Sequence, residues 1–149
     1  MKICLVSSSG GHLFQLYQLK SFWQGKKRFW VSFKTQDVTS LLDGERVFFA
    51  HYPESRNALN TIKNFFLAFD ILRKERPEVI ISCGAAIAPP FFLAGKILGI
   101  KSIYIEPVDF IKKPSLAGQL SYFLADLFLI QDKKQKKFFP KAHYWGATL

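Results

Sequence analysis

Short apolar runs alternate with longer stretches of helical periodicity along the whole chain, and this alternation limits the fold more than any other feature. Runs rich in Val, Ile and Phe, apolar on both faces, are typical of parallel strands covered by helices on each side. The expected strands span 2–7, 29–32, 47–50, 79–82, 102–105 and 127–130. The expected helices span 11–23, 37–42, 57–74, 88–98, 115–125 and 133–138. This order predicts an α/β fold, a Rossmann-like doubly wound parallel sheet whose ligands bind beyond the carboxyl ends of the strands.

Composition predicts one domain, residues 1–149, with a partly apolar and anionic partner. Hydrophobic residues make up 49% of the 149 positions, enough to build a sizeable core, and no Ser/Pro/Gly-rich linker divides the chain. The net charge of +10 accompanies sixteen Phe. Because the charge is scattered among aromatic residues and not gathered in a reading helix, a nucleic-acid partner is not expected.

The targeting and redox features predict a cytoplasmic chain without a metal or a cofactor. The apolar start at 1–6 is too short for a signal-peptide core. The best spanning candidate, 85–95, contains two prolines and stops at Lys96, so no membrane-spanning helix is expected. Cys4 and Cys83 lie in strand-like runs, which favours buried reduced thiols, and the three His lack ligand spacing.

The first expected strand ends in a small-residue loop, 7–12 (SSSGGH), that runs into a helix. Glycines let backbone amides approach a ligand closely, and a helix N-terminus favours an anion such as a phosphate. The loop matches neither G-x-G-x-x-G nor the Gly-Lys-Ser/Thr ending of a P-loop, which disfavours a standard dehydrogenase or a mononucleotide kinase. Two interpretations remain: a tight turn with His12 as an ordinary first-turn residue, or a functional loop with His12 as general base toward a hydroxyl.

Two further strand ends carry residues that suit a ligand site. The fourth strand ends in 82–84 (SCG), where small residues either leave room for a ligand or let the next helix pack closely. The fifth ends in 105–107 (IEP). There, Glu106 is either a group that holds a sugar hydroxyl or a cation, or a solvated residue that caps the following turn.

These three loops, in this order, resemble those of MurG-like glycosyltransferases of the GT-B fold. In that family a Gly-Gly-x-Gly-Gly-His loop follows the first strand and a Glu follows a later one, as 9–12 (SGGH) and Glu106 do here; the first glycines are replaced by 7–9 (SSS). The likeness is greatest to stand-alone versions of the acceptor-side half. These are bacterial capsular or exopolysaccharide subunits of PssD type and the membrane-side subunit of the eukaryotic enzyme that adds the second GlcNAc to dolichol-linked sugar. The resemblance covers nearly the whole chain.

The resemblance implies a division of labour and a set of site residues. The N-terminal half of such enzymes binds the lipid-linked acceptor, the C-terminal half binds the sugar nucleotide, and transfer takes place in the cleft between them. The chain ends at Leu149, where a fused enzyme continues into its donor domain, so a second polypeptide is expected to supply that half. The resemblance assigns catalysis to His12 and Glu106, both lining the cleft. It assigns acceptor contacts to Ser9, Gly10, Gly11, Ser82 and Gly84.

A polyprenyl-linked acceptor requires contact with the bilayer surface. In the expected helix 57–74, the polar stripe of Lys63 and Asp70 is interrupted by Leu67, and apolar side chains almost surround 65–69. The helix is therefore either buried on both sides or has an outer face that touches lipid or a partner. The expected membrane contacts are Lys63, Phe66, Leu67 and Arg73. The lysine-rich run 133–137 is expected to be solvated or to contact the missing subunit.

The resulting hypothesis is a subunit of a two-component hexosyltransferase in capsule or exopolysaccharide biosynthesis, inactive without its partner. It binds a polyprenyl-diphosphate-linked sugar at the inner face of the cytoplasmic membrane. The partner is expected to be a small Rossmann-like donor-binding subunit that brings a UDP-sugar. The alternative is a non-catalytic membrane scaffold or activator of a complete glycosyltransferase.

Overall fold

One parallel sheet organises the computed structural model, which describes residues 1–53 and 56–148. Its strands run in the order β3-β2-β1-β4-β5-β6-β7, and every neighbouring pair is parallel. The strands are β1 (Lys2–Val6), β2 (Lys27–Ser32), β3 (Val47–Phe49), β4 (Val79–Ser82), β5 (Lys101–Ile105), β6 (Leu127–Ile130) and β7 (His143–Tyr144). The predicted α/β, Rossmann-like architecture is confirmed.

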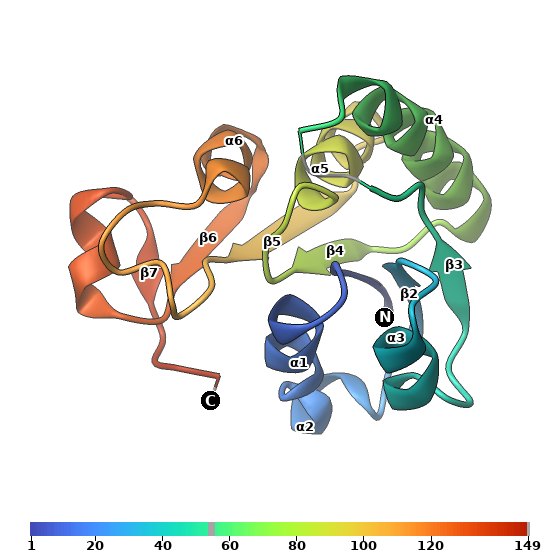
Figure 1. The fold of residues 1–149 in the computed structure, drawn as a ribbon, viewed down its shortest axis with the longest axis horizontal. Coiled ribbons are helices and arrows are strands. Elements are labelled where there is room, and N and C mark those ends of the chain that lie inside the picture. Colours follow the sequence, from blue (N-terminus) through green and yellow to red (C-terminus); the bar gives the residue numbers. More distant parts are fainter. Residues whose placement is uncertain (54–55, 149) are drawn as a thin grey trace.

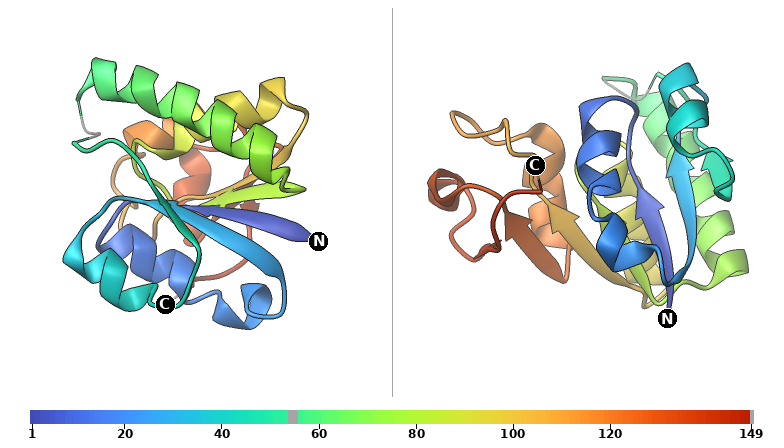
Figure 2. Two further views of the ribbon diagram at one scale, coloured as in Figure 1. Left: turned by 90° about the vertical axis from the view of Figure 1, so that its right-hand side faces the viewer. Right: turned by 90° about the horizontal axis from the view of Figure 1, so that it is seen from below.

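Helices cover both faces of the sheet (Figures 1 and 2). They are α1 (Gly11–Tyr17), α2 (Lys20–Trp23), α3 (Gln36–Leu41), α4 (Ala58–Glu75), α5 (Ala88–Ile97), α6 (Leu116–Leu124) and the 3₁₀ helix η1 (Lys133–Lys137). One layer consists of α4, α5 and α6, with α5 packed against both of the others. The other layer consists of α1, α2 and α3. No helix in the described part of the chain is both long and apolar enough to cross a membrane.

Side-chain alternation along the strands divides the core between these two layers. On β1, Cys4 and Val6 belong to the cluster under α4–α6, whereas Ile3 and Leu5 belong to the cluster under α1–α3. All four are fully buried, which is why the strand is apolar at successive positions and not at alternate ones. Cys4 and Cys83 are both buried and free, as predicted.

The predicted helix 11–23 is wrong in one respect: the chain turns at Leu19 and forms two short helices. The indole Nε1 of Trp23 donates a hydrogen bond to the carbonyl oxygen of Leu16 at 3.3 Å. The turn also brings the Trp23 ring edge-on against Trp30 of β2, with centroids 5.4 Å apart. A tertiary contact thus ends the helix where local periodicity would continue it.

Two C-terminal features also differ from the prediction. The lysine-rich segment forms a single 3₁₀ turn, η1, because Asp132 and Gln135 make a capping box around it. The following segment adds β7, a two-residue strand beside β6. Its His-Tyr sequence has no apolar run, so strand periodicity gives no signal there.

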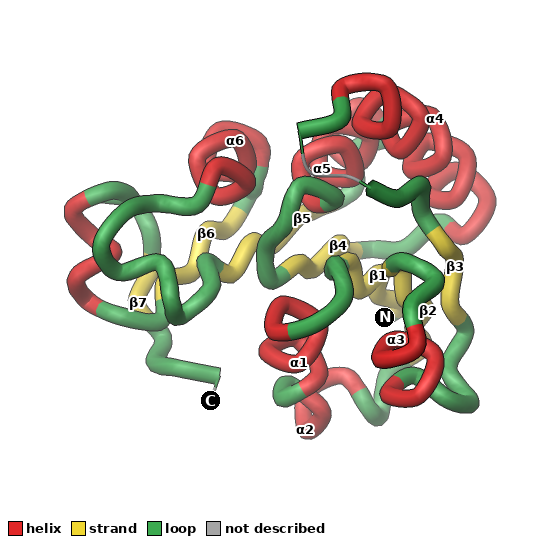
Figure 3. Tube along the Cα trace, in the orientation of Figure 1, coloured by secondary structure: helices red, strands yellow, loops and turns green. Residues whose placement is uncertain are grey.

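The strand order places three loops together at the carboxyl edge of the sheet. Because β4 lies between β1 and β5, the loops that follow these strands are neighbours, although β1 and β5 are far apart in sequence. The loops gather on the side of the sheet where α1, α4, α5 and α6 begin (Figure 3). The chain reverses its order of winding between β1 and β4, which is where ligands bind in open sheets of this kind.

Candidate functional site

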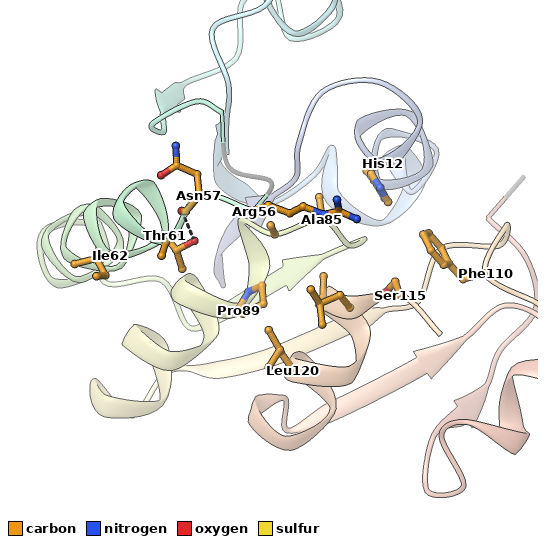
Figure 4. Close-up of a pocket in the computed structure, with 14 residues that line it drawn as sticks. His12, Arg56, Asn57, Thr61, Ile62, Ala85, Pro89, Phe110, Ser115 and Leu120 are labelled. Atoms are coloured by element: carbon orange, nitrogen blue, oxygen red, sulfur yellow. Dashed lines mark hydrogen bonds between the residues drawn. The ribbon is translucent and has the colours of Figure 1, made fainter. Parts of the chain in front are cut away.

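A largely apolar groove of about 810 Å³ lies at this edge, between the first turns of α4, α5 and α6 (Figure 4). Alkyl and aromatic side chains form most of its walls, and polar groups enter it from the loops that follow β1 and β3. It is lined by His12, Arg56, Asn57, Ala58, Thr61, Ile62, Ala85, Ala86, Pro89, Phe110, Ser115, Leu116, Ala117 and Leu120. A site with a polar end and a long apolar wall suits an amphipathic ligand.

His12 lies in the first turn of α1, and its half-buried ring lines the groove. Its Nδ1 is 3.0 Å from the carbonyl oxygen of Cys83. A carbonyl oxygen only accepts, so Nδ1 carries the hydrogen of this bond and the neutral ring has its lone pair on Nε2. This bond holds the imidazole in one orientation, and in the neutral ring Nε2 is free to accept a proton, as a general base requires.

Gly84 makes this placement of His12 possible. A Cβ at position 84 would lie 2.9 Å from His12 Nδ1 and 2.8 Å from Pro107 Cγ. The backbone there also has φ of +90°, a conformation that side chains rarely adopt. The two interpretations of 82–84 were room for a ligand and close packing of the next helix. The structure instead uses the missing side chain of Gly84 to bring His12 and Pro107 close to the backbone.

The loop before His12 is only partly available to a ligand. Gly10 and Gly11 are exposed, and a Cβ would meet open space at either position. The amide of Gly10, however, donates to Asp37 Oδ2 at 2.8 Å. Ser9 is half-buried, and its carbonyl oxygen accepts from the hydroxyl of Ser8. The loop lies next to the groove but outside its lining.

Glu106 corrects the sequence-based expectation that it lines the cleft. It follows β5 as predicted, but its side chain is fully buried below the groove wall, with 0% exposure. Its carboxylate accepts hydrogen bonds from the amide and the hydroxyl of Ser115, both at 2.9 Å. Ser82 is also fully buried, with its hydroxyl directed to the carbonyl oxygen of Gly84. Whether a side chain is buried depends on the segments that pack around it. The motifs therefore could not predict that Glu106 and Ser82 are buried.

Several groove residues carry no signal in the sequence. Arg56 comes from the loop before α4, and Figure 4 shows its side chain extending across the groove toward the His12 side. Phe110 comes from the loop after β5, and Leu116 and Leu120 from α6. The one local indication of the groove is that Leu116 and Leu120, four residues apart in α6, are both exposed, because a surface helix normally has polar residues on its exposed side.

The groove opens onto a large apolar surface on the layer of α4, α5 and α6. We define this apolar outer face by its exposed side chains: Leu59, Ile62, Phe66, Leu93, Ile97, Leu116, Leu120 and Phe123. Within each helix they are three or four residues apart and so share one side of it. Ile62, Leu116 and Leu120 belong to both the groove and this face. An apolar surface of this kind marks an interaction site.

The residues predicted for membrane contact are divided by the structure. Phe66 is 65% exposed on the apolar outer face, and Lys63 and Arg73 are exposed on the same helix. Leu67 is half-buried and packs against the core under α4–α6. Of the two interpretations of this helix, burial on both sides is therefore wrong: one side is buried and the other is free in this chain.

A family model described as "Oligosaccharide biosynthesis protein Alg14 like" matches residues 3–148. The chain belongs to the Alg14-like family. The human UDP-N-acetylglucosamine transferase subunit ALG14 is 24% identical to it over 60% of the chain, which spans 44% of the human protein. The rat subunit of the same name is 21% identical over 99% of the chain and 82% of the rat protein.

Solved structures place the Alg14-like chain in the same fold as one half of MurG. The crystal structure of MurG from Acinetobacter baumannii superposes with a TM-score of 0.78 at 19% identity, over 99% of this chain and 46% of that protein. At this identity the match concerns the fold alone. The predicted resemblance to one half of MurG-like proteins and to the ALG14 subunit is confirmed.

Proposed function

We propose that this chain is the acceptor-binding subunit of a two-component glycosyltransferase. It holds a polyprenyl-diphosphate-linked sugar in the groove, and a separate small Rossmann-like subunit binds the UDP-sugar donor. The observation that carries the proposal is the continuity of the site. The groove has the His12 imidazole, oriented by the Cys83 carbonyl, at one end and runs into the apolar outer face at its wall. Ile62, Leu116 and Leu120 belong to both.

The chemistry follows from what His12 offers. A hydroxyl of the acceptor sugar attacks the anomeric carbon of the donor, the bond from that carbon to the diphosphate breaks, and UDP leaves. The hydroxyl proton passes to His12 Nε2, whose ring is held by the Cys83 carbonyl. General-base assistance of this kind contributes about 10²- to 10⁴-fold. Inversion at the anomeric carbon is expected, because a single displacement has no covalent intermediate.

The surroundings of the groove favour a lipid-linked acceptor over a soluble one. Arg56 lines the end of the groove near His12, where it would face the diphosphate. The apolar outer face lies where the polyprenyl chain would leave the groove, and Lys63 and Arg73 lie on α4 beside it. Each cation near an anionic membrane surface contributes about 1 kcal/mol. We therefore infer peripheral attachment at the inner face of the cytoplasmic membrane. The resemblance to PssD-type subunits favours a role in capsule or exopolysaccharide synthesis.

Acceptor binding is tested on the chain without its partner. The probe is a sugar linked through diphosphate to a short, water-soluble prenyl chain, with affinity measured by calorimetry. Leu120→Glu places a charge in the groove wall and should weaken binding about tenfold or more. The matched control is Phe22→Glu, a comparably exposed change on α2 in the opposite helix layer, which should leave affinity within about twofold. Equal losses in the two variants would contradict the proposed site.

Transfer itself requires the donor subunit. The assay supplies the same acceptor and a radiolabelled UDP-sugar to the chain, to the donor subunit and to the pair, and counts label in the lipid fraction. Transfer by the pair alone supports the proposal. A donor subunit that is fully active by itself would instead favour the scaffold alternative.

Membrane attachment is tested by flotation with vesicles of phosphatidylglycerol and phosphatidylcholine. Phe123→Glu removes the most exposed aromatic of the apolar outer face, which is 79% exposed, and should reduce the bound fraction several-fold. Phe22→Glu on α2, in the opposite helix layer, is the matched control and should bind as the wild type does. Loss of binding in both variants or in neither would argue against this face.

A further inference from the structure

Glu106 is built into the start of α6. Its Oε1 accepts from the Ser115 amide and its Oε2 from the Ser115 hydroxyl, each at 2.9 Å. Ser115 is the N-cap of the helix, and its Oγ accepts from the amide of Gly118 at 2.8 Å. One residue thus joins the carboxylate of Glu106 to the first turn of α6, and the hydroxyl of Tyr104 lies 3.4 Å from the same Oγ.

Gly118 provides the space that this arrangement needs. A Cβ on Gly118 would lie 2.1 Å from Glu106 Oε2 and 2.7 Å from Ser115 Oγ. The carboxylate therefore lies directly against the helix backbone, and nothing longer than a hydrogen atom fits between them. Glu106 is fully buried and does not line the groove, whereas Ser115, which binds its carboxylate, does.

Three buried glutamine side chains bind the backbone of the loop between Glu106 and Ser115. Gln135 Nε2 donates to the Pro107 carbonyl at 2.8 Å, and Gln131 Nε2 donates to the Glu106 carbonyl at 3.1 Å. Gln15 Oε1 accepts from the Val108 amide at 3.2 Å. The beginning of the loop is therefore fixed to α1, to the residue that follows β6 and to η1, and the Glu106 carboxylate binds Ser115 at its end.

We propose that Glu106 is a positioning residue that sets the first turn of α6, and with it the groove wall made by Leu116, Ala117 and Leu120, without touching the acceptor. This inference rests on the proposed function only in treating the groove as the acceptor site. Its structural part stands by itself: the carboxylate aligns α6, and α6 forms the wall.

The structural part is tested by amide hydrogen exchange, which needs no activity. Glu106→Ala leaves the Ser115 amide and hydroxyl without their acceptor, so the Gly118 and Gln119 amides should exchange about tenfold faster. Glu106→Gln keeps an oxygen for the Ser115 amide and should stay within about threefold of the wild type. Unchanged exchange in Glu106→Ala, with the variant folded as judged by circular dichroism, would overturn the proposal.

The catalytic part is tested with the reconstituted pair. A positioning role predicts that Glu106→Ala raises KM for the acceptor about tenfold with a smaller change in kcat, and that Glu106→Gln largely restores it. Should Glu106→Gln instead lower kcat by about 100-fold or more at unchanged KM, the carboxylate acts on the substrate and the proposal is wrong. Ser115→Ala should resemble Glu106→Ala, and the double variant should be little worse than either alone.

These measurements separate the two proposals. If the wild-type pair transfers no sugar to any lipid-diphosphate acceptor, the proposed function fails, and the exchange data still decide whether Glu106 aligns α6. If transfer is normal and the Gly118 amide is insensitive to Glu106→Ala, the positioning role fails and the proposed function stands.

Discussion

The loops after β1 and β5 each carry a residue that the motifs mark for catalysis, and the fold places these residues in opposite environments. His12 is half-buried, makes one hydrogen bond to a backbone carbonyl and keeps its second nitrogen available at the groove. Glu106 is fully buried, and both of its oxygens are bound by Ser115. A strand's carboxyl end brings a residue near the site, but chemistry requires a free polar atom, and of these two residues only His12 has one.

Two glycines allow the close packing of His12 and Glu106. Gly84 lies beside His12 and lets the imidazole approach the backbone that follows β4. Gly118 lies beside Glu106 and lets the carboxylate approach the backbone of α6. The same device therefore orients a reactive group in one loop and holds a helix in the other.

The largest expected effect separates the two residues by activity. His12→Asn in the reconstituted pair should lower kcat by about 10²- to 10⁴-fold, because the neutral amide cannot take the hydroxyl proton. Glu106→Gln should stay within about threefold under the same assay. His143→Asn, an exposed change on β7, is the control and should be silent. Normal turnover in His12→Asn would show that His12 is not the general base.

The next effect is on stability as a function of pH. Burial raises the pKa of Glu106 from 4.5 to about 7, opposed by the hydrogen bonds from Ser115 and reinforced by Asp109. The native state therefore binds this proton more tightly than the unfolded chain does between pH 4.5 and about 7. Stability should fall by on the order of 3 kcal/mol as pH rises through that window and level off above it.

Chemical denaturation of the wild type and Glu106→Gln at each pH isolates this contribution. The unfolding free energy of the wild type minus that of the variant should decline between pH 4.5 and about 7, because groups that titrate independently of Glu106 contribute equally to both. Burial raises the pKa values of the neighbouring Tyr104 and Cys83 further above this window, so they do not titrate within it. If the unfolding free energies of the two proteins changed with pH in parallel, the Glu106 carboxyl would not be buried as it is in the structure.

A smaller effect compares the glycines. Gly84→Ala should cost about 2 kcal/mol, because the methyl group meets Pro107 and His12 and the backbone has positive φ. Gly118→Ala should cost about 1 kcal/mol, since displacing Glu106 outweighs the gain in helix propensity. Gly25→Ala, with open space around its Cβ, is the control. A neutral Gly118→Ala would indicate that Glu106 moves easily, against the positioning role.

The smallest effect is the loss of the cap itself. Ser115→Ala removes the hydroxyl that joins Glu106 to the Gly118 amide and should lower the unfolding free energy by about 1 kcal/mol. Ser121→Ala is a matched control in the same helix, because the buried Ser121 hydroxyl has no hydrogen-bond partner among the described residues. It should be neutral or slightly stabilising by thermal denaturation. A Ser115→Ala variant as stable as Ser121→Ala would break the link between Glu106 and α6.

The strands were predicted from the sequence more completely than the residues of the site. All strands with an apolar run were predicted to within a few residues, because β1, β2 and β4 to β6 are buried on both faces. The break at Leu19 and strand β7 were not, since a Trp23–Trp30 contact and pairing to β6 decide them. At the site, the motif pointed to His12, which lines the groove, whereas Arg56 and Phe110 line the groove without having been predicted.

By itself the sequence determined the fold class and the order of the elements along the chain, because hydrophobic periodicity depends on neighbours two to four residues away. The tertiary structure alone decided that Glu106 is buried and that α4, α5 and α6 form a groove. It also decided that Leu67 packs against the core while Phe66 is exposed. The physical reason is that burial and hydrogen bonding depend on atoms from distant segments. Whether a polar side chain is free to react is settled only when those segments pack.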